Sequence, residues 1–390
     1  MKAIGLVSAT LNNYGSLLQT YALQRKVSEC GCYTEIVKYR EPVSSKIRRL
    51  QYGEYLKVCL NKIFLRKVAG LRHHHLNKML QSRASAFERF RCQNLLFSKP
   101  CFNRNQLEAL AADYQMVVLG SDQLWQPMNL LMDFFTLTFV PDRVRKVAYA
   151  ASFGVSEIPQ RMKPAYKAYL ERFDKISCRE SAGAEIVRNL IGREVPVVCD
   201  PTLLMTAGEW LPLLSDKATP NDDYIFCYFL GNNPQQRMFV MQLKERTGCS
   251  IVALPHIVEY VSSDEKFADC LLYDAGPAEF LHLINNAKYV CTDSFHATVF
   301  SLQFHRQFFV FDRFENSKGH STTSRIETLL GVVGREDRLI RNTLEALASF
   351  PALCDIDYLD IDKKLETFRQ FSHNFLKEIL DNVKNGKENC

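Results

Sequence analysis

The side chain with the clearest chemical use is His296, which follows a short apolar run at residues 289–291 and the polar residues Thr292, Asp293 and Ser294. After these, apolar side chains recur at helical spacing. Any of the three polar residues can cap that helix, so His296 lies in its first turn. Anions bind where a strand leads into a helix N-terminus, because the backbone N–H groups there are unpaired and the helix dipole is positive. An imidazole in that place can contact an anion and exchange a proton with it. The same residues also fit a histidine that only hydrogen-bonds a neighbouring loop.

A second charged side chain is predicted at the start of another helix. Residues 324–331 form a short helical pattern that ends in Gly331, and Arg325 lies in its first turn. The positive end of the helix dipole disfavours a cation at this place. An anionic ligand would offset that cost, so Arg325 indicates a ligand; a salt bridge to a neighbouring carboxylate is the alternative.

Five predicted strands in the first half of the chain each end in small or polar residues. The strands cover residues 2–8, 116–119, 146–151, 175–178 and 195–199. The polar residues that follow them are, in order, Asn13, Asp122, Ser152, Arg179 and Asp200. Any one of these fits a helix cap or a turn. However, parallel strands end at one edge of a sheet, and open α/β sheets bind their ligands at that edge. We therefore expect a site along it.

Strands and helices alternate along the whole chain, which predicts two Rossmann-like, doubly wound α/β domains that face a cleft. The first domain covers residues 1–215, a polar linker lies at residues 215–223, and the second domain covers residues 222–350. Residues 355–385 contain a long amphipathic helix that we expect to brace the first domain. The first loop lacks the G-x-G-x-x-G fingerprint, so a dinucleotide is not indicated.

Length and composition agree with this organisation. A chain of 390 residues with 47% hydrophobic and 24% charged residues is typical of a globular protein of about two domains. Its N-terminal apolar run is too short for a signal peptide, and no segment approaches the roughly 20 apolar residues of a membrane span. We therefore expect a cytoplasmic protein. Thirteen cysteines without a repeated spacing fit reduced thiols, and no metal site is predicted.

The positive charge of the chain is concentrated in an insertion at about residues 40–92. It holds thirteen Lys or Arg and three Glu, a local balance of +10 in a chain whose net charge is +6. Apolar residues recur at helical spacing between residues 55 and 80. This basic helical pattern fits a solvated face packed on the sheet, a nucleic-acid patch or contact with the anionic inner surface of a membrane. No nucleic-acid motif accompanies it, so we expect no nucleic-acid partner; a solvated face is the default and peripheral membrane contact is the second interpretation.

Seven motifs in order along residues 3–380 resemble those of the polysaccharide pyruvyl transferase family. They are Asn13-Tyr14-Gly15 with the helix after it, Gly120-Ser121-Asp122-Gln123-Leu124-Trp125, Tyr149-Ala150-Ala151-Ser152-Phe153-Gly154, Ser177-Cys178-Arg179-Glu180, Asp200-Pro201-Thr202-Leu203-Leu204, Thr292-Asp293-Ser294-Phe295-His296 and Ser324-Arg325-Ile326-Glu327.

The resemblance implies a fold similar to that of GT-B glycosyltransferases. It also implies transfer of the enolpyruvyl group of phosphoenolpyruvate to a sugar of a polysaccharide or its lipid-linked precursor, which gives a pyruvate ketal and phosphate. Phosphoenolpyruvate is then a co-substrate, and no cofactor is expected. By the same likeness, Ser294 and His296 lie on the donor side, in the second domain, and the first domain binds the acceptor.

That reaction needs a proton for the methylene carbon, groups that hold phosphate and carboxylate, and a base for the attacking hydroxyl. We expect His296 to act as general acid or base and Asp122 to be the base for the hydroxyl. The expected donor-binding residues are Ser294, Arg325 and Arg179. The expected acceptor-binding residues are Asn13, Gln19, Gln123 and Trp125, with the indole as a stacking surface. A nucleotide-sugar-dependent glycosyltransferase of GT-B type and a non-catalytic glycan-assembly protein are the alternatives.

Overall fold

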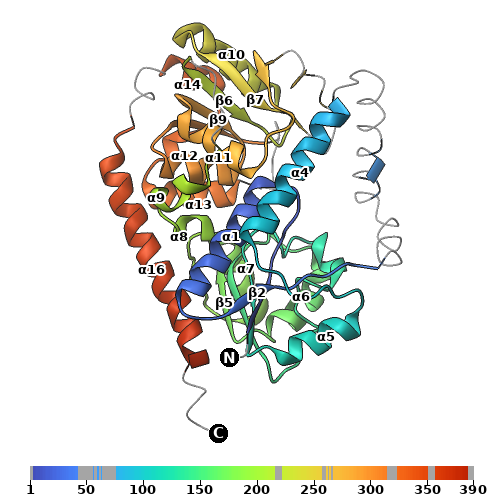
Figure 1. Cartoon of the computed structure of the whole chain (residues 1–390). Coiled ribbons are helices and arrows are strands. Elements are labelled where there is room, and N and C mark those ends of the chain that lie inside the picture. The colour runs from blue at the N-terminus through green and yellow to red at the C-terminus, as the bar shows by residue number, and fades with distance from the viewer. Residues whose placement is uncertain are drawn as a thin grey trace.

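The computed structural model consists of two α/β domains, each built on a parallel sheet (Figure 1). It describes residues 3–42, 56, 59, 60, 63, 76–215, 222–256, 261, 263, 264, 267–313, 323–349 and 356–384. The predicted fold class is therefore confirmed. Most of the basic insertion lies outside the described residues, as does most of the predicted linker. Of the predicted helical pattern before residue 76, residues 56, 59, 60 and 63 are described, and they are helical.

The first sheet has the strand order β2-β1-β3-β4-β5, and every pair in it is parallel. Its strands are β1 (Ile4–Val7), β2 (Thr34–Ile36), β3 (Met116–Leu119), β4 (Arg145–Ala151) and β5 (Lys175–Cys178). The helices of this domain include α1 (Tyr14–Glu29), α4 (Leu76–Asn94), α5 (Arg104–Asp113), α6 (Lys163–Leu170), α7 (Ser181–Ile191), α8 (Pro201–Leu204) and α9 (Ala207–Trp210). Since β1 has β2 on one side and β3 on the other, the strand order reverses between β1 and β3. Open sheets bind ligands at the carboxyl ends of the two strands that flank such a reversal.

The second sheet has the order β11-β10-β9-β6-β7-β8 and is also parallel throughout. Its strands are β6 (Tyr224–Tyr228), β7 (Ser250–Leu254), β8 (Cys270–Leu271), β9 (Tyr289–Thr292), β10 (Gln307–Phe311) and β11 (Leu339–Ile340). The helices are α10 (Pro234–Thr247), α11 (Pro277–Asn286), α12 (Phe295–Gln303), α13 (Ser324–Val333) and α14 (Thr343–Ala348). Here the order reverses between β6 and β9, so this domain also has a predicted ligand position at two neighbouring strand ends.

Both faces of each sheet are covered, which explains why the strands are continuous apolar runs. In β3 all four residues are buried, and alternate side chains belong to different core clusters. Met116 and Val118 join a cluster that continues into the second domain, where it includes Phe226. Val117 packs in a separate cluster under α5, α6 and α7. The two domains therefore share one continuous apolar core between their sheets.

The last helix, α16 (Tyr358–Lys384), runs along one side of the molecule past both domains (Figure 1). It contacts α13 of the second domain and α8 of the first. Ser372 is fully buried, and its hydroxyl accepts a hydrogen bond of 2.8 Å from the backbone N–H of Cys199. Arg369 donates to the carbonyl of Leu203 at 2.7 Å. We propose that the domain division follows the predicted boundaries, with α16 as the element that returns to the first domain.

Two details of the first domain differ from the predictions. Residues 195–199 do not form a strand; Val197 makes only an isolated bridge to Cys178. The short strand β2 at the sheet edge was not predicted, because three residues carry no measurable periodicity.

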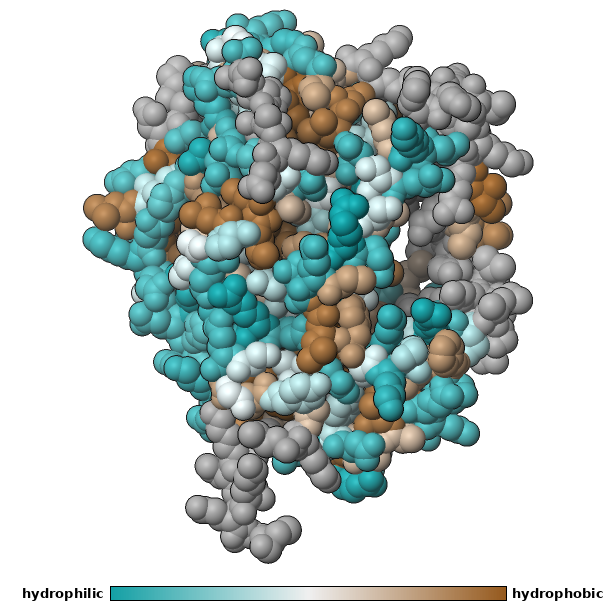
Figure 2. Space-filling model, in the orientation of Figure 1, coloured by the Kyte–Doolittle hydropathy of each residue, from teal (hydrophilic) through white to brown (hydrophobic). Residues whose placement is uncertain are grey.

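The outer surface seen in Figure 2 is mainly hydrophilic, with apolar side chains in separate small patches. Among the described residues, no helix combines the length and the apolar composition that a membrane crossing needs.

Candidate functional site

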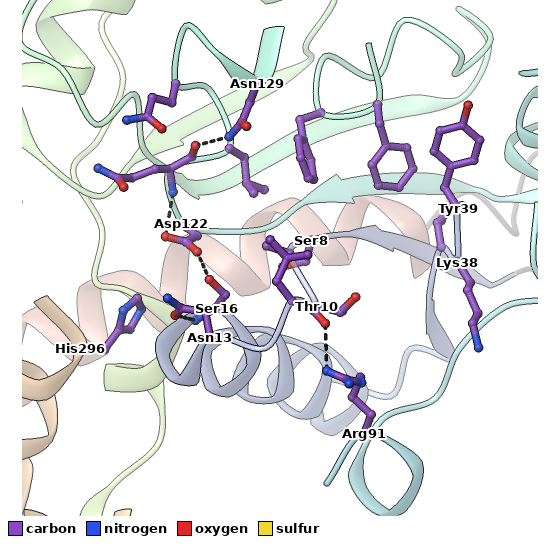
Figure 3. A pocket seen from close by; sticks show the side chains of 18 of the residues that line it. Ser8, Thr10, Asn13, Ser16, Lys38, Tyr39, Arg91, Asp122, Asn129 and His296 are labelled. Atoms are coloured by element: carbon purple, nitrogen blue, oxygen red, sulfur yellow. Dashed lines mark hydrogen bonds between the residues drawn. The ribbon is translucent and has the colours of Figure 1, made fainter. Parts of the chain in front are cut away.

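A cavity of about 1000 Å³ lies at the carboxyl ends of the strands of both sheets. The strand-order reversals of the two sheets meet here: Asn13 after β1 and Asp122 after β3 line it, as do Leu230 after β6 and Ser294 after β9. Figure 3 shows the part of its wall that comes from the first domain, with His296 of the second domain beside Asn13 and Ser16. The cavity is thus formed by both domains at the position that the sheet topology predicts.

The histidine is carried by α12, whose first turn is fixed by two side chains. Ser294 has an extended backbone, and its hydroxyl accepts a hydrogen bond from the N–H of Ala297 at 3.4 Å. The N–H of Ser294 in turn donates to the hydroxyl of Thr292 at 3.0 Å. Of the three predicted caps, Ser294 is therefore the one used. His296 is 7% exposed and lies on the cavity wall.

The first domain holds the imidazole of His296 in place from two sides. Its Nδ1 edge packs directly against the α-carbon of Gly15, where even a methyl group would overlap the ring. Its Nε2 lies 3.6 Å from Oδ2 of Asp200, which is fully buried. The histidine of one domain is thus inserted between a glycine and a carboxylate of the other. Neither contact was predicted, because each depends on how the two domains pack.

Asp122 lies on the cavity wall in a left-handed backbone conformation, with φ of 83°. Its carboxylate accepts hydrogen bonds from the hydroxyl of Ser16 and, at 2.9 Å, from the N–H of Gln123 (Figure 3). Burial raises the pKa of Asp122, but the positive charges of Arg179 and His296 and the bond from Ser16 outweigh burial and keep the pKa below its ordinary value. Asp122 is therefore an ionised acceptor that faces the cavity.

Arg179 does not line the cavity, although the sequence suggested that it binds the donor directly. It is 3% exposed and lies behind the wall, where its Nη1 donates to Asp200 at 2.7 Å. Asp122 and Glu180 lie within 3.8 and 3.9 Å of its other nitrogens. Three carboxylates surround the guanidinium and offset much of its charge. Arg179 therefore organises the wall instead of contacting a ligand there.

Asp200 links these groups. It caps α8 by accepting hydrogen bonds from the N–H and hydroxyl of Thr202 at 2.9 and 2.6 Å, and Ser121 donates to its other oxygen at 2.8 Å. Burial raises the pKa of Asp200, but the charges of His296 and Arg179 and these hydrogen bonds hold the pKa far below its ordinary value. A permanent negative charge therefore lies beside the imidazole.

Two arginines of the second domain complete the wall near Ser294. Arg325, in the first turn of α13, is 5% exposed, and its guanidinium lies 5.9 Å from the ring centroid of Phe295. Burial and the nearby charge of Arg179 lower the pKa of Arg325 to about 9. Arg313, which follows β10, also lines the cavity. The sequence reasoning did not single out Arg313, although it occupies the same strand-end position as the predicted residues.

The predicted acceptor residues divide into two pairs. Asn13 and Gln123 line the cavity, and Asn13 also caps α1 by accepting from the N–H of Ser16 at 3.1 Å. Gln19 does not reach the cavity; it is fully buried, and its amide donates to Ser8, Ser16 and Thr20. Because Gln19 is buried and does not line the cavity, the structure does not place it where an acceptor would bind.

Trp125 does not offer a stacking surface either. It is 2% exposed and packs against Phe153, Tyr169 and Phe173, while its indole N–H donates to the carbonyl of Phe135 at 3.1 Å. The turn at Asp122 directs the chain so that Gln123 faces the cavity and Trp125 faces the core. The indole therefore stabilises the wall from behind.

Comparisons with known proteins agree with this architecture. The family model described as polysaccharide pyruvyl transferase matches residues 13–315, a stretch that contains Asp122, Asp200 and His296. A search of the curated proteins found no match.

Several solved structures share the fold at low sequence identity. UDP-GlcNAc 2-epimerase from Methanocaldococcus jannaschii is 11% identical, with a TM-score of 0.52 over 91% of this chain and 93% of that one. The wall teichoic acid polymerase TagF is 12% identical, with a TM-score of 0.50 over 99% and 90%. Arabidopsis thaliana UGT89C1 complexed with UDP-L-rhamnose is 8% identical, with a TM-score of 0.51 over 98% of each chain. These likenesses show a fold of the GT-B type.

The family match extends over well more than half of the chain, and it includes the strand ends and the helix start that form the cavity. This chain belongs to the polysaccharide pyruvyl transferase family.

Proposed function

We propose that the protein transfers the enolpyruvyl group of phosphoenolpyruvate to two hydroxyls of a sugar in a polysaccharide or its lipid-linked precursor, forming a pyruvate ketal and releasing phosphate. The observation that carries this proposal is the cationic end of the cavity. There, Arg325 and Arg313 lie beside the N-terminus of α12 and its histidine.

Phosphoenolpyruvate carries a phosphate and a carboxylate, and this end of the cavity suits both. Burial and the neighbouring guanidinium of Arg179 destabilise the charge of Arg325, and an anion bound beside it would offset that cost. A guanidinium can bind two oxygens of a phosphate or carboxylate at once, which a single ammonium group cannot do. The first turn of α12 adds its positive dipole, and Ser294 adds a hydroxyl. We therefore propose Ser294, Arg325 and Arg313 as the donor-binding residues.

The reaction begins with a proton added to the methylene carbon, which becomes the methyl group of the ketal. The adjacent carbon gains oxocarbenium character and is attacked by one sugar hydroxyl; loss of phosphate then lets the second hydroxyl form the other C–O bond. The two hydroxyl protons balance the one added to carbon and the one carried away on phosphate. We propose that His296 supplies the first proton, because it lies on the cavity wall beside the donor-binding arginines and its ring is held by Asp200 and Gly15.

The proposed part of Asp122 follows from its low pKa. A carboxylate that is already stabilised by Arg179 and Ser16 is a weak base, so it would not keep a proton taken from a hydroxyl. It accepts a hydrogen bond well, and it lies on the acceptor side of His296 with Asn13 and Gln123. We propose that Asp122 orients the attacking hydroxyl and that Asn13 and Gln123 bind the same sugar.

The test is phosphate release from phosphoenolpyruvate by the purified protein, with and without acceptors that end in galactose, mannose or N-acetylhexosamine. Acceptor-dependent release is expected, and His296→Ala should lower it by about a hundredfold or more, which is the usual contribution of a general acid. His305→Asn is the matched control, because His305 is exposed and its φ of 54° is one that asparagine tolerates. A loss of less than about tenfold in a folded His296→Ala variant would exclude proton transfer by this residue.

A nucleotide-sugar glycosyltransferase is the second candidate, favoured by the likeness to a fold that binds UDP-L-rhamnose in UGT89C1. Isothermal titration separates the two. Affinity for phosphoenolpyruvate without affinity for a panel of nucleotide sugars supports pyruvyl transfer, and the reverse result supports glycosyl transfer. A protein that binds an acceptor glycan but neither donor would be the non-catalytic assembly protein.

We also propose peripheral contact of the basic insertion with an anionic membrane. Leu56, Leu60 and Ile63 are helical and exposed, and their spacing puts them on one side of a helix within a segment rich in Lys and Arg. The test is flotation with anionic liposomes, comparing the protein with a version whose Lys and Arg between residues 46 and 72 are neutralised. Equal flotation of the two proteins would mean that this segment is a solvated face and does not contact the membrane.

A further inference from the structure

We propose that the cavity holds a second acceptor subsite, which binds the part of the glycan beyond the reacting sugar and selects acceptors that carry negative charge there. We call this part of the cavity the outer arm. It is lined by Lys38, Tyr39, Arg40, Phe97, Phe134 and Phe135. This inference rests on the proposed function only in taking the ligand to be a sugar acceptor.

The size and the direction of the cavity require a ligand longer than one sugar. A volume of about 1000 Å³ is at the upper end of sites that hold drug-sized ligands, and phosphoenolpyruvate is far smaller than such ligands. In Figure 3, Lys38 and Tyr39 lie at the opposite side of the cavity from His296, with Ser8 and Thr10 between them. When the donor and the reacting sugar occupy the end of the cavity at His296, the outer arm therefore remains available to neighbouring units of the glycan.

One side of the outer arm is an aromatic surface. Tyr39 and Phe134 have ring centroids 5.3 Å apart, and Phe134 and Phe135 are separated by the same distance. Tyr39 and Phe135 are only partly buried and both line the cavity, so part of each residue is accessible to a ligand. The C–H faces of sugar rings pack on such rings, while their hydroxyls stay solvated. These residues can provide the stacking surface that Trp125 does not.

The outer arm also contains two cations without a carboxylate partner among the residues that the structure describes. Lys38 lies over the ring of Phe97, 5.3 Å from its centroid, and the guanidinium of Arg40 lies 5.8 Å from that of Phe102. Neither forms an ion pair within the described part of the chain, although Glu41 lines the same arm. A cation held against an aromatic ring is partly desolvated and gains from an anion that reaches it.

Arg91 and Glu88 also line the cavity here, and the pKa of Glu88 is lowered by the hydrogen bond that Arg91 donates to it and, less strongly, by the charge of Lys38. Arg91 pairs with Glu88 at 2.9 Å and donates to the carbonyl of Thr10 and the side chain of Asn12. Their charges cancel, and Arg91 serves to hold the loop after β1. Lys38 and Arg40 outnumber the remaining carboxylate, Glu41, so the described residues of the outer arm carry a net positive charge that attracts anionic ligands.

A carboxylate and a phosphate are the two groups of a glycan that satisfy such cations. The carboxylate would come from a uronic acid unit, and the phosphate from the reducing end of an activated or lipid-linked precursor. Both accept charge-assisted hydrogen bonds from lysine and arginine. A neutral glycan would still pack on Tyr39 and Phe135 but would leave Lys38 and Arg40 without a partner.

The experiment compares three oligosaccharides that share the reacting sugar and differ only beyond it: one neutral, one with a uronic acid unit and one with a phosphate at the reducing end. Their dissociation constants are measured by calorimetry without donor. At least one charged oligosaccharide should bind about tenfold more tightly than the neutral one, as expected for a hydrogen bond to a charged group. The double variant Lys38→Gln/Arg40→Gln should remove that preference and leave the affinity for the neutral one unchanged.

The matched control is Lys99→Gln, since Lys99 is exposed in the same domain and does not line the cavity. It should keep the preference. A preference for only one charged oligosaccharide identifies carboxylate or phosphate as the ligand. Equal binding of all three, no binding by any, or a preference that survives in the double variant would overturn the subsite. The calorimetry contains no donor, so it does not depend on which donor the protein uses. If phosphoenolpyruvate is not the donor, the separate activity assay would show this as an absence of phosphate release.

Discussion

At the scale of single residues, the site depends on a close contact that only glycine permits. Gly15 is the second residue of α1, and the imidazole of His296 packs where its side chain would be. This contact and the carboxylate of Asp200 fix the orientation of a ring that belongs to the other domain. The position of the proposed proton donor is thus determined by residues that transfer no proton themselves.

Gly15→Ala should therefore lower turnover by about a hundredfold, which is what a misplacement of roughly 1 Å costs an oriented reaction. Donor affinity should change little, because Arg325, Arg313 and Ser294 are on the other domain. The measurements are kcat for acceptor-dependent phosphate release and the dissociation constant of phosphoenolpyruvate. The matched control is Gly208→Ala, which changes the second residue of α9, where no atom lies near the added methyl group. Equal activity of the two variants would mean that the ring tolerates the displacement.

At the scale of elements, β9 fixes a neighbouring loop through Asp293, which is 2% exposed. Its two oxygens accept hydrogen bonds of 2.8 Å from the backbone N–H groups of Leu230 and Gly231, which follow β6. The strand-order reversal of the second sheet lies between these same two strands. Asp293 therefore holds together the two strand ends that form the donor side of the cavity.

Asp293→Ala should lower the free energy of unfolding by about 3 kcal/mol, because each buried donor left unsatisfied costs about 1–3 kcal/mol. Denaturation in urea provides the measurement. Asp223→Ala is the control: its carboxylate is largely exposed and pairs with Lys288 at 2.6 Å, an interaction worth less than about 1 kcal/mol. Similar losses in the two variants would mean that the loop after β6 finds other acceptors.

Some of these elements could be predicted from the sequence because the residues that begin and end them are distinctive. Helices α10 and α11 have clear signals in the sequence, because proline begins each of them and Gly248, in the left-handed conformation, ends the first. Such signals are local. Strands of two or three residues, such as β2 and β11, have none, and the structure alone reveals them.

The same distinction explains which site residues were predicted. Asn13, Asp122 and His296 could be placed because each follows a strand end that is visible in the sequence. The direction of a side chain is not local. Trp125 faces the core because aromatic rings from several elements pack around it there. Gln19 faces inward from α1, where its amide donates to the hydroxyl of Ser8 at the end of the first strand. For the same reason, the pairing of Arg179 with Asp200 could not be predicted from the sequence around either residue.

At the scale of the whole molecule, the two domains are joined by one core, and Tyr14 lies near its centre. Tyr14 is fully buried at the start of α1, and its ring stacks on Phe280 of α11 with a centroid distance of 4.5 Å. Its hydroxyl donates to the carbonyl of Ala275 at 2.8 Å. Because Tyr14 immediately precedes Gly15, the contact that joins the domains also sets the position of the glycine that holds His296. Domain packing and the proposed proton transfer are therefore coupled through adjacent residues.

Tyr14→Ala should separate the unfolding of the two domains. Loss of a buried aromatic side chain costs about 3–5 kcal/mol, and here most of that cost falls on the contact between domains instead of on either sheet. Differential scanning calorimetry should change from one transition to two, while phosphoenolpyruvate still binds the second domain and turnover is lost. Tyr33→Ala, at a residue that is 54% exposed, should keep one transition and full activity. A single transition in Tyr14→Ala at a lower temperature would mean that other residues link the domains energetically. Helix α16 would then be the next element to change, because it contacts α13 of one domain and α8 of the other.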